Sequence, residues 1–278
     1  MFAFLARATS LVLALSVIFP AFVPAGAAQA PYRILLTNDD GVRAPGIAAM
    51  AQALSGLGEV TIIAPVENHS GTGHAITLSD PIYTERVEVA GIPATGITAT
   101  PATCVRLAFD KLMQTRPDLV VSGVNRGSNF GLNAYISGTV AAAREAAMQG
   151  VPAIATSLDI KGHPNYGPAA AATAKVVQIV KQGGLPKGIF LNVNVPAGTE
   201  FKGLKFARQS NQMGTERFDE GKTPYGRRLF WSFFQQPTEA EPGSDVQAAL
   251  DGFVAVTPLV ASEFSGEAFE KLKGRFEK

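Results

Sequence analysis

Short apolar runs alternate with helical patterns along most of the chain, and this alternation limits the possible folds more than any other feature. The runs 33–37 and 60–64 are typical of buried strands, and the first ends at the turn cluster Asn38-Asp-Asp-Gly. Between them, Pro45 begins a pattern with an apolar face every 3.6 residues, and Gly58 ends it. The same order returns later, with helices predicted over 103–113 and 139–149 and strands over 119–122 and 153–156. Strands that are buried on both faces and alternate with helices predict an α/β fold with a doubly wound, mostly parallel, Rossmann-like sheet.

The composition changes after Pro196, where Gly, Gln, Arg and aromatic residues become frequent. Residues 201–236 hold Trp231 beside several phenylalanines, and we interpret them as hairpins or an arm that projects from the core. The run 253–257 looks like a strand that returns to the core. The predicted organisation is an α/β core over 31–200, then an arm, a returning strand and a C-terminal tail over 201–278. So much apolar surface on an arm predicts a symmetric dimer or a larger oligomer.

The first 30 residues have the order of a secretory signal peptide. Arg7 precedes the apolar run 11–23, and small residues follow the run. We predict a signal peptide over 1–27, with cleavage after Ala27 or, alternatively, after Ala30. A membrane anchor is the competing interpretation, but Pro20 breaks a run that is already short for a membrane span. The expected location is therefore outside the cytoplasm, in the periplasm, with no membrane contact in the mature form; a cytoplasmic location is the alternative.

Charge and cysteine content exclude several kinds of partner. Only 17% of the 278 residues are charged, the formal net charge is +1 and the isoelectric point is about 7.8. A nucleic-acid polymer is therefore not expected as a primary partner. Cys104 is the single cysteine, which excludes an intramolecular disulfide and a paired-cysteine metal site. The motifs for dinucleotides, P-loop phosphates and a nucleophilic serine are all incomplete, and any metal must be held by oxygen atoms or by the three histidines.

Polar side chains follow the predicted strands at the edge where an open parallel sheet places its ligands. Asp39 and Asp40 come directly after the first strand, and Asn125 follows the 119–124 run. Two adjacent carboxylates repel each other unless a cation lies between them, and Mg²⁺ or Mn²⁺ prefers oxygen ligands. The alternative is that Asn-Asp-Asp-Gly is only a turn. Ser137-Gly-Thr likewise begins a predicted helix, which suits either an anion or an ordinary N-cap.

Several blocks of the sequence together resemble the SurE (survival protein E) family of 5′/3′-nucleotidases. The most specific is Ile34-Leu-Leu-Thr-Asn-Asp-Asp-Gly-Val-Arg-Ala-Pro-Gly, which is similar to the opening signature of that family. The other blocks follow in the same order as in the family, at 64–71, 121–125, 137–143, 192–196, 243–245 and 256–258. The resemblance covers most of the chain from about residue 32 to residue 260.

The resemblance implies a metal-dependent phosphomonoesterase that hydrolyses nucleoside 5′- and 3′-monophosphates to nucleoside and phosphate, acting as a homodimer or homotetramer. One divalent ion, Mg²⁺ or Mn²⁺, would be held by four oxygen ligands, from Asp39, Asp40, Ser70 and Asn125. Among these, Asp39, Asp40 and Asn125 are the expected catalytic residues. The phosphate group would be bound by a second set, comprising Asn38, Ser137, Gly138, Thr139 and Arg126.

The nucleotide preference stays open, because several positions depart from the commonest family pattern: Thr103, Arg126, Ser128, Asn133 and Ile136. Arg126 follows the predicted ligand Asn125, so its guanidinium could bind phosphoryl oxygens or could be an ordinary solvated side chain. Two other function classes compete with the enzyme. One is an exported solute-binding protein without turnover, and the other is an interaction protein built on the aromatic arm.

Overall fold

The computed structural model describes residues 30–235 and 239–277, and residues 31–278 form one compact unit. The predicted signal peptide lies outside the described residues. Within the described part of the chain, no helix is both long enough and apolar enough to cross a membrane.

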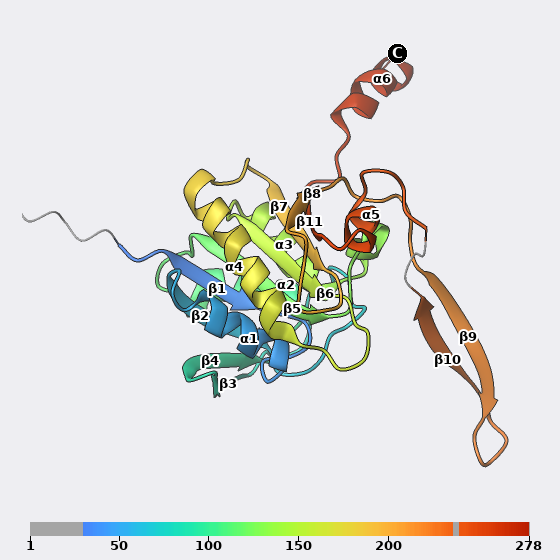
Figure 1. The fold of residues 1–278 in the computed structure, drawn as a ribbon, viewed down its shortest axis with the longest axis horizontal. Coiled ribbons are helices and arrows are strands. Elements are labelled where there is room, and N and C mark those ends of the chain that lie inside the picture. The colour runs from blue at the N-terminus through green and yellow to red at the C-terminus, as the bar shows by residue number, and fades with distance from the viewer. Residues whose placement is uncertain (1–29, 236–238, 278) are drawn as a thin grey trace, which may run out of the picture. The chain divides into compact units, whose positions relative to one another are not determined.

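Nine strands of the described chain form one sheet in the order β3-β4-β2-β1-β5-β6-β7-β11-β8 (Figure 1). The strands are β1 Arg33–Thr37, β2 Glu59–Pro65, β3 Thr84–Val89, β4 Ile92–Ile97, β5 Leu119–Arg126, β6 Ala153–Leu158, β7 Ile189–Val195, β8 Leu204–Phe206 and β11 Val254–Val260. The strands from β4 to β7 run parallel. The edge strand β3 is antiparallel to β4, and β11, next to the other edge strand β8, is antiparallel to β7. The predicted mostly parallel sheet and the returning strand are both confirmed.

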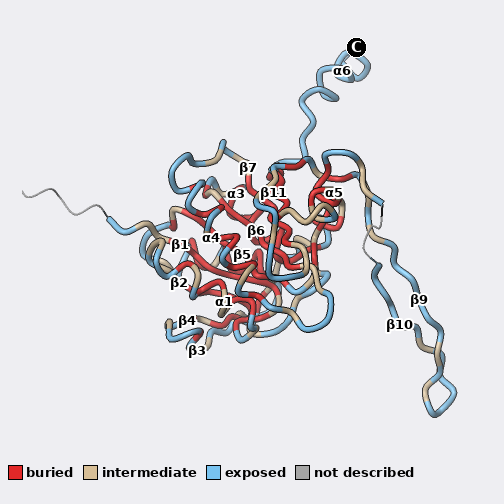
Figure 2. Tube along the Cα trace, in the orientation of Figure 1, coloured by how far each residue is buried: buried red, intermediate tan, exposed pale blue. Residues whose placement is uncertain are grey.

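Helices cover both faces of this sheet, as the alternating pattern predicts. On one face, α1 (Pro45–Leu54) and α4 (Tyr166–Gly183) pack on Ile34 and Leu36 of β1. On the other face, α2 (Pro101–Leu107) and α3 (Gly138–Met148) pack on Leu35. Successive side chains of a strand point to opposite faces, so an uninterrupted apolar strand supplies both cores. The sheet is doubly wound, and its buried strands and the buried parts of its helices are red in Figure 2.

The predicted helix over 103–113 begins two residues earlier, at Pro101, and its last part, η1 (Ala108–Leu112), is a π-helix. The helix predicted over 139–149 is α3, and the hydroxyl oxygen of Ser137 caps it by accepting from the Val140 N–H at 3.1 Å. Two further helical elements are short: η2 (Gly131–Tyr135), a 3-10 helix, and α5 (Asp245–Leu250). The C-terminal helix α6 (Gly266–Phe276) has no buried residue.

The 201–236 segment has two different parts. Its beginning, β8, pairs in parallel with β11 at the edge of the main sheet. Its end is a separate antiparallel hairpin, β9 (Thr215–Lys222) with β10 (Arg228–Gln235), which is exposed along most of its length (Figure 2). The arm-like hairpin expected from the sequence is therefore present.

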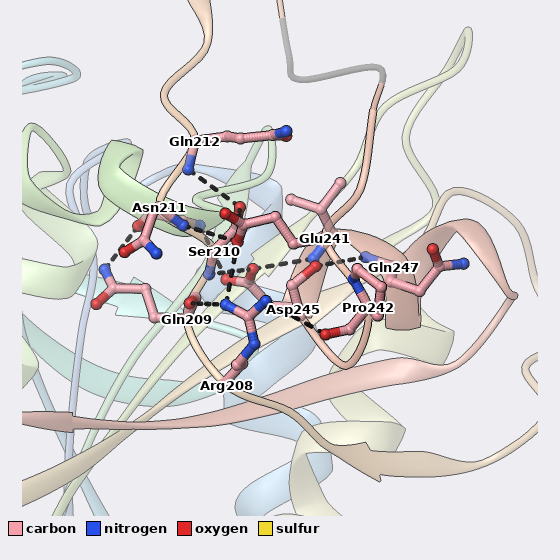
Figure 3. A network of polar contacts seen from close by, with 12 residues as sticks. Arg208, Gln209, Ser210, Asn211, Gln212, Glu241, Pro242, Asp245 and Gln247 are labelled. Atoms are coloured by element: carbon pink, nitrogen blue, oxygen red, sulfur yellow. Dashed lines mark hydrogen bonds and ion pairs between the residues drawn. The ribbon is translucent and has the colours of Figure 1, made fainter.

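Two carboxylates hold the segment between these two parts (Figure 3). The buried Asp245 accepts from the backbone N–H of Gly131 at 2.8 Å and from that of Ser210 at 3.0 Å. Glu241 accepts from the Ser210 hydroxyl at 3.2 Å and from Arg208 at 3.1 Å. Because carboxylates accept strongly from N–H and O–H donors, this network ties residues 208–212 to η2 beside the candidate site.

Candidate active site

The site lies where the strand order reverses. β1 is in the middle of the sheet, with β2 on one side and β5 on the other, and Thr37 pairs with Ser122. Residues that follow these two strands therefore meet at one edge of the sheet, outside the carboxyl ends of the strands, which is where open α/β sheets bind ligands. The contact of the Arg126 N–H with the Asp40 carboxylate, at 2.9 Å, confirms that the ends of β1 and β5 come together.

Asp39 is the most enclosed of the four predicted metal ligands, with 3% of its surface exposed. The Thr139 hydroxyl donates to its carboxylate. Gly138 lets the start of α3 approach so closely, since a Cβ at that position would lie 2.8 Å from the Asp39 Cβ and 3.0 Å from its Oδ2. The predicted metal ligand and the predicted phosphate loop, 100 residues apart in sequence, are thus in direct contact.

Both carboxylates are held in surroundings that favour their neutral forms. Burial raises the pKa of Asp39 to about 6, and the neighbouring negative charge of Asp40 adds to this effect. Burial also raises the pKa of Asp40, although the hydrogen bond from the Arg126 N–H works in the opposite direction. A cation bound between the two groups would relieve both effects.

The segment 68–70 lies beside these carboxylates and carries the predicted ligand Ser70. The His69 N–H donates to the Asp39 carbonyl at 2.7 Å, and the Asn68 amide approaches Asp40 Oδ1 at 3.5 Å. The Asn68 side chain also accepts from the Ser70 N–H at 2.7 Å. These contacts fix the backbone of Ser70 next to the Asp39-Asp40 turn.

Asn125 is placed by an irregularity in β5. The register between β5 and β6 shifts between Ser122 and Asn125, and such a shift turns the side chains that follow it. The Asn125 Nδ2 donates to the Gly127 carbonyl at 2.6 Å, which points the amide in one direction and leaves the Oδ1 atom as an acceptor.

The donor set fits a hard divalent cation. Among the described residues, no group of three or more His, Cys, Asp or Glu side chains could hold a metal. The candidate set instead combines two carboxylates with the neutral oxygens of Ser70 and Asn125, which is the all-oxygen chemistry that Mg²⁺ and Mn²⁺ prefer. In the same turn, Asn38 donates to the Gly41 carbonyl at 2.8 Å, and its buried Oδ1 has no hydrogen-bond partner. Asn38 therefore shapes the turn that presents both carboxylates, and its predicted contact with phosphate stays a prediction.

An open cleft of about 480 Å³ adjoins Asp40 and is also lined by Arg43, Arg126 and Tyr166. Arg43 is paired with Glu85 at 2.6 Å. Arg126 is exposed and forms no ion pair with any described residue, so its guanidinium is available on the wall of the cleft. This places Arg126 beside the predicted metal ligands, as its sequence position suggests.

A buried ion cluster that sequence reasoning missed supports the loop that carries Ser70. Glu145 of α3 accepts from His74 at 2.9 Å and from Arg106 at 2.9 Å, and Gln149 donates to it at 2.8 Å. Burial opposes the charge of Glu145, but these donors prevail and lower its pKa to about 2. No local pattern links residues 71 positions apart, so only the fold reveals this cluster.

A second support is an asparagine network under the loop that follows β5. Asn194 of β7 accepts from the Asn129 N–H at 2.7 Å, and Asn192 donates to the Asn129 carbonyl at 2.9 Å. The Asn129 side chain donates to Ser157 at 2.7 Å. The 192–196 block therefore positions the loop beside Arg126 and does not itself join the metal ligands.

Three of the positions that depart from the family pattern have structural roles. The Thr103 hydroxyl accepts from the Thr77 N–H at 2.8 Å, which anchors the end of the loop that carries Ser70. Asn133 accepts from the Gly214 N–H at 3.0 Å, at the base of the hairpin. The Ile136 carbonyl accepts from the Gly73 N–H at 3.0 Å. Each of these contacts holds a loop around the site.

Comparison with known proteins agrees with this geometry. A family model described as "Survival protein SurE" matches residues 34–216. A protein named 5′-nucleotidase SurE from Syntrophotalea carbinolica is 42% identical over 242 residues, which cover 86% of this chain and 95% of that protein. A protein of the same name from Geobacter sulfurreducens is 44% identical and covers 81% of this chain and 87% of its own length. The crystal structure of SurE from Aquifex aeolicus superposes with a TM-score of 0.76 at 35% identity, and covers 87% of this chain and 99% of its own.

Proposed function

This chain belongs to the survival protein SurE family, and from that premise we propose that it is a divalent-metal-dependent nucleotidase. The reaction would be hydrolysis of nucleoside 5′- and 3′-monophosphates to nucleoside and phosphate. The observation that carries the proposal is the contact between the Asp39 carboxylate and the start of α3, because it puts a cation site and an anion site side by side. The named relatives are 5′-nucleotidases, so a solute-binding protein without turnover is not supported.

Asp39, Asp40, Ser70 and Asn125 would hold one Mg²⁺ or Mn²⁺. When bound, the ion would supply charge stabilisation to the phosphoryl group and a more acidic water. Asp39 and Asp40 are kept close by the turn that Asn38 shapes, and Asn125 is oriented by its bond to the Gly127 carbonyl. These residues build an anionic pocket that a cation neutralises.

The start of α3 would bind the phosphate group. Ser137, Gly138 and Thr139 begin an 11-residue helix, and the unpaired N–H groups at such an end attract anions. Arg126, on the wall of the cleft beside Asp40, would add a charge-assisted hydrogen bond. Hydrogen-bond donors that are fixed before the reaction stabilise negative charge as it develops on the phosphoryl oxygens.

A phosphate-release assay tests the activity. We expect turnover of 5′- and 3′-monophosphates with Mg²⁺ or Mn²⁺, and none after treatment with EDTA. Asp39→Asn and Asp40→Asn should each lose most of the turnover while circular dichroism shows a folded chain, because each removes a charge from the cation site. Asp80→Asn, at an exposed position, is the matched control. Retained metal binding and activity in both site variants would refute this assignment.

We further propose export to the periplasm, on the basis of the charged, apolar and small-residue order of the first 30 residues. The mature chain would begin at or near Ala28. Mass spectrometry of the protein purified from its own host checks this, and an intact Met1 on a cytoplasmic form would contradict it.

The hairpin supports a proposed homodimer or homotetramer. Cross-strand pairing puts Phe218, Phe230 and Phe234 on one face of the β9–β10 hairpin, and Trp231 and Phe233 on the other. All five side chains are exposed, Trp231 to 63%. Exposed aromatic surface on both faces of a two-stranded ribbon is typical of an element that packs against another subunit.

A further inference from the structure

A second cavity, of about 890 Å³, is lined in part by the last turns of α3. It is also lined by α2, by the end of β11 and by the loops around residue 74, before β7 and before α6, including His74, Arg106, Arg144, Lys187, Glu263 and Phe264. A smaller cavity of about 310 Å³ adjoins it and shares Arg144 and Phe264. Neither cavity shares a lining residue with the cleft at Asp40. The position is therefore separate from the proposed catalytic site.

Arg144 is the unusual group in this cavity. Only 8% of its surface is exposed, and its guanidinium lies over the rings of Tyr135 at 5.3 Å and Phe190 at 5.9 Å. Among the described residues, no carboxylate oxygen lies within 4.0 Å of it, and Glu263 acts on it only from a longer range. Burial lowers the pKa of Arg144, because removal from water disfavours the charged guanidinium. A buried cation without a paired anion is costly, so this guanidinium calls for a negatively charged partner.

The other charged groups of the cavity do not supply an ion-pair partner for Arg144. Arg106 and His74 are both committed to Glu145, at 2.9 Å each. Lys187 lies in the loop before β7 and makes no ion pair with a described residue. Glu263 also lines the cavity, but no described carboxylate lies within 4.0 Å of Arg144 or Lys187, so neither cation has an ion-pair partner.

Most of the remaining lining is apolar, with Ser262 and Glu263 as the polar members, and much of it is open to solvent. Phe264 is 70% exposed, and Met148 and Val260 are also exposed. A cavity with a few charged donors and apolar walls, in a volume of 300–1,000 Å³, is the usual form of a small-molecule site.

We propose that this cavity binds a small anion that carries a phosphate, sulfonate or carboxylate head group on an apolar body. The head group contacts Arg144 and Lys187, and the body packs on Met148, Val260 and Phe264. The planar guanidinium, already oriented by two aromatic rings, is suited to a two-pronged hydrogen bond with an oxyanion. This site is additional to the proposed nucleotidase function and does not depend on it.

Calorimetric titration of the full chain with octane-1-sulfonate, in EDTA, tests the proposal, because a sulfonate is not a phosphate ester and EDTA removes the metal from the other site. We expect saturable binding with a stoichiometry of one per chain. The neutral analogue 1-octanol should bind much more weakly, since it lacks the head group. Inorganic sulfate should also bind much more weakly, since it lacks the apolar body.

The matched variants are Arg144→Gln and Lys187→Gln, with Arg86→Gln at an exposed position on β3 as the control. Loss of a charge-assisted hydrogen bond should weaken octanesulfonate binding about 10- to 150-fold in Arg144→Gln. Lys187→Gln should weaken it severalfold, and it tests the site independently should Arg144→Gln fail to fold. Equal affinity in wild type, Arg144→Gln and Lys187→Gln would overturn the proposal. No binding to wild type, with a changed sedimentation coefficient in Arg144→Gln, would also overturn it and would make Arg144 a subunit contact.

Discussion

Asp39 combines two demands that oppose each other, burial and negative charge. The Thr139 hydroxyl donates to its carboxylate, the His69 N–H donates to its backbone carbonyl, and Gly138 lies against its side chain. In the absence of a cation, such a carboxyl group takes up a proton more readily than a solvated one, which explains its raised pKa of about 6. The packing that destabilises the ionised Asp39 carboxylate would also strengthen its binding to a metal ion.

Metal binding should therefore depend on pH through Asp39. Below pH 6 the metal-free carboxyl group is protonated, and Mg²⁺ must displace that proton. The apparent association constant should fall about tenfold per pH unit below 6 and level off above it. Calorimetric Mg²⁺ titrations between pH 5 and pH 8 measure this slope. Asp39→Asn, which has no proton to displace at that position, should show a shallower slope; an identical slope would exclude Asp39 as its origin.

The raised pKa of Asp39 should also make the stability of the metal-free protein depend on pH. The folded state holds the Asp39 proton up to about pH 6, whereas the unfolded chain releases it near pH 3.8. The folded state thus binds more protons between these values, so its free energy of unfolding falls as the pH rises through this window. The free energy that the metal-free protein loses when Asp39 ionises is the cost that a bound cation would offset.

Arg126 can be tested without removing the hydrogen bond to Asp40, since its backbone N–H donates that bond. The variant loses the guanidinium charge, which lowers the pKa of Asp40, so Asp40 becomes somewhat easier to protonate. Arg126→Ala should lower kcat/KM for monophosphates about 10- to 150-fold, because a charge-assisted hydrogen bond contributes about 1.5–3 kcal/mol. A rise in KM alone would assign the guanidinium to the bound substrate, and a fall in kcat would assign it to the transition state. Arg126→Lys, which keeps the charge, should recover part of the loss. Wild-type kinetics in the Ala variant would leave Arg126 as a solvated side chain.

At the scale of elements, α3 connects most of the functional features of the molecule. Its first turn contacts Asp39, Glu145 in its middle anchors the loop that carries Ser70, and Arg144 faces the second cavity. Its tight fit depends on small residues, since the helix contains five alanines besides Gly138. A rigid helix of this kind keeps these sites at fixed distances from one another.

The Glu145 cluster should stabilise the fold at neutral pH and lose that effect in acid. Its folded pKa of about 2 lies below the ordinary value of 4.5, so the stabilisation is present above pH 4.5 and is lost as the pH falls toward 2. The shift sets an upper limit of about 3 kcal/mol, because solvent screens the half-exposed Arg106. Glu145→Gln should therefore lower the free energy of unfolding at pH 7, and the difference from wild type should shrink below pH 4. Urea unfolding across this range measures it; a constant difference would contradict the cluster's role.

The elements nearest the site could be predicted from the sequence because their signals are local. The apolar run of β1, the Pro45 start of α1 and the Ser137 cap of α3 are each decided by neighbouring residues. The pairing of His74 with Glu145, the Asn129–Asn194 contact and the turn of β8 into the main sheet all depend on long-range packing. The candidate metal ligands came from a family resemblance joined to strand-end positions, and the contact between Asp39 and Thr139 required the fold.

At the scale of the whole molecule, the hairpin should control assembly. Replacing residues 215–235 by a short Gly-Ser linker should convert the proposed oligomer to a smaller species and leave the core folded. The core should survive because Asp245 and Glu241 hold residues 208–212 without the hairpin. Light scattering at micromolar concentration, with circular dichroism as the control for folding, measures both. A monomeric wild type, or an unchanged mass after the deletion, would contradict the prediction.

The edges of the main sheet have a different character from its centre. Parallel strands fill the middle, whereas β8, at one edge, has only three residues, and β3, at the other, carries Glu85, Arg86 and Glu88. Short or charged edge strands discourage further strands from adding to a sheet. The proposed association through the hairpin would therefore not compete with pairing along the edges of the sheet.

The separation in sequence of the site's parts has a consequence for how the chain becomes active. Asp39 meets Thr139 across 100 residues, and Asp40 meets Arg126 across 86. Contacts between such distant residues form slowly, because the intervening loops must close first. The site can be completed only after β1, β5 and α3 have docked, so the affinity for metal should return last during refolding, after the helices have formed. Metal binding then reports completed folding, and a partly folded chain would carry neither a cation site nor the charge that draws phosphate into it.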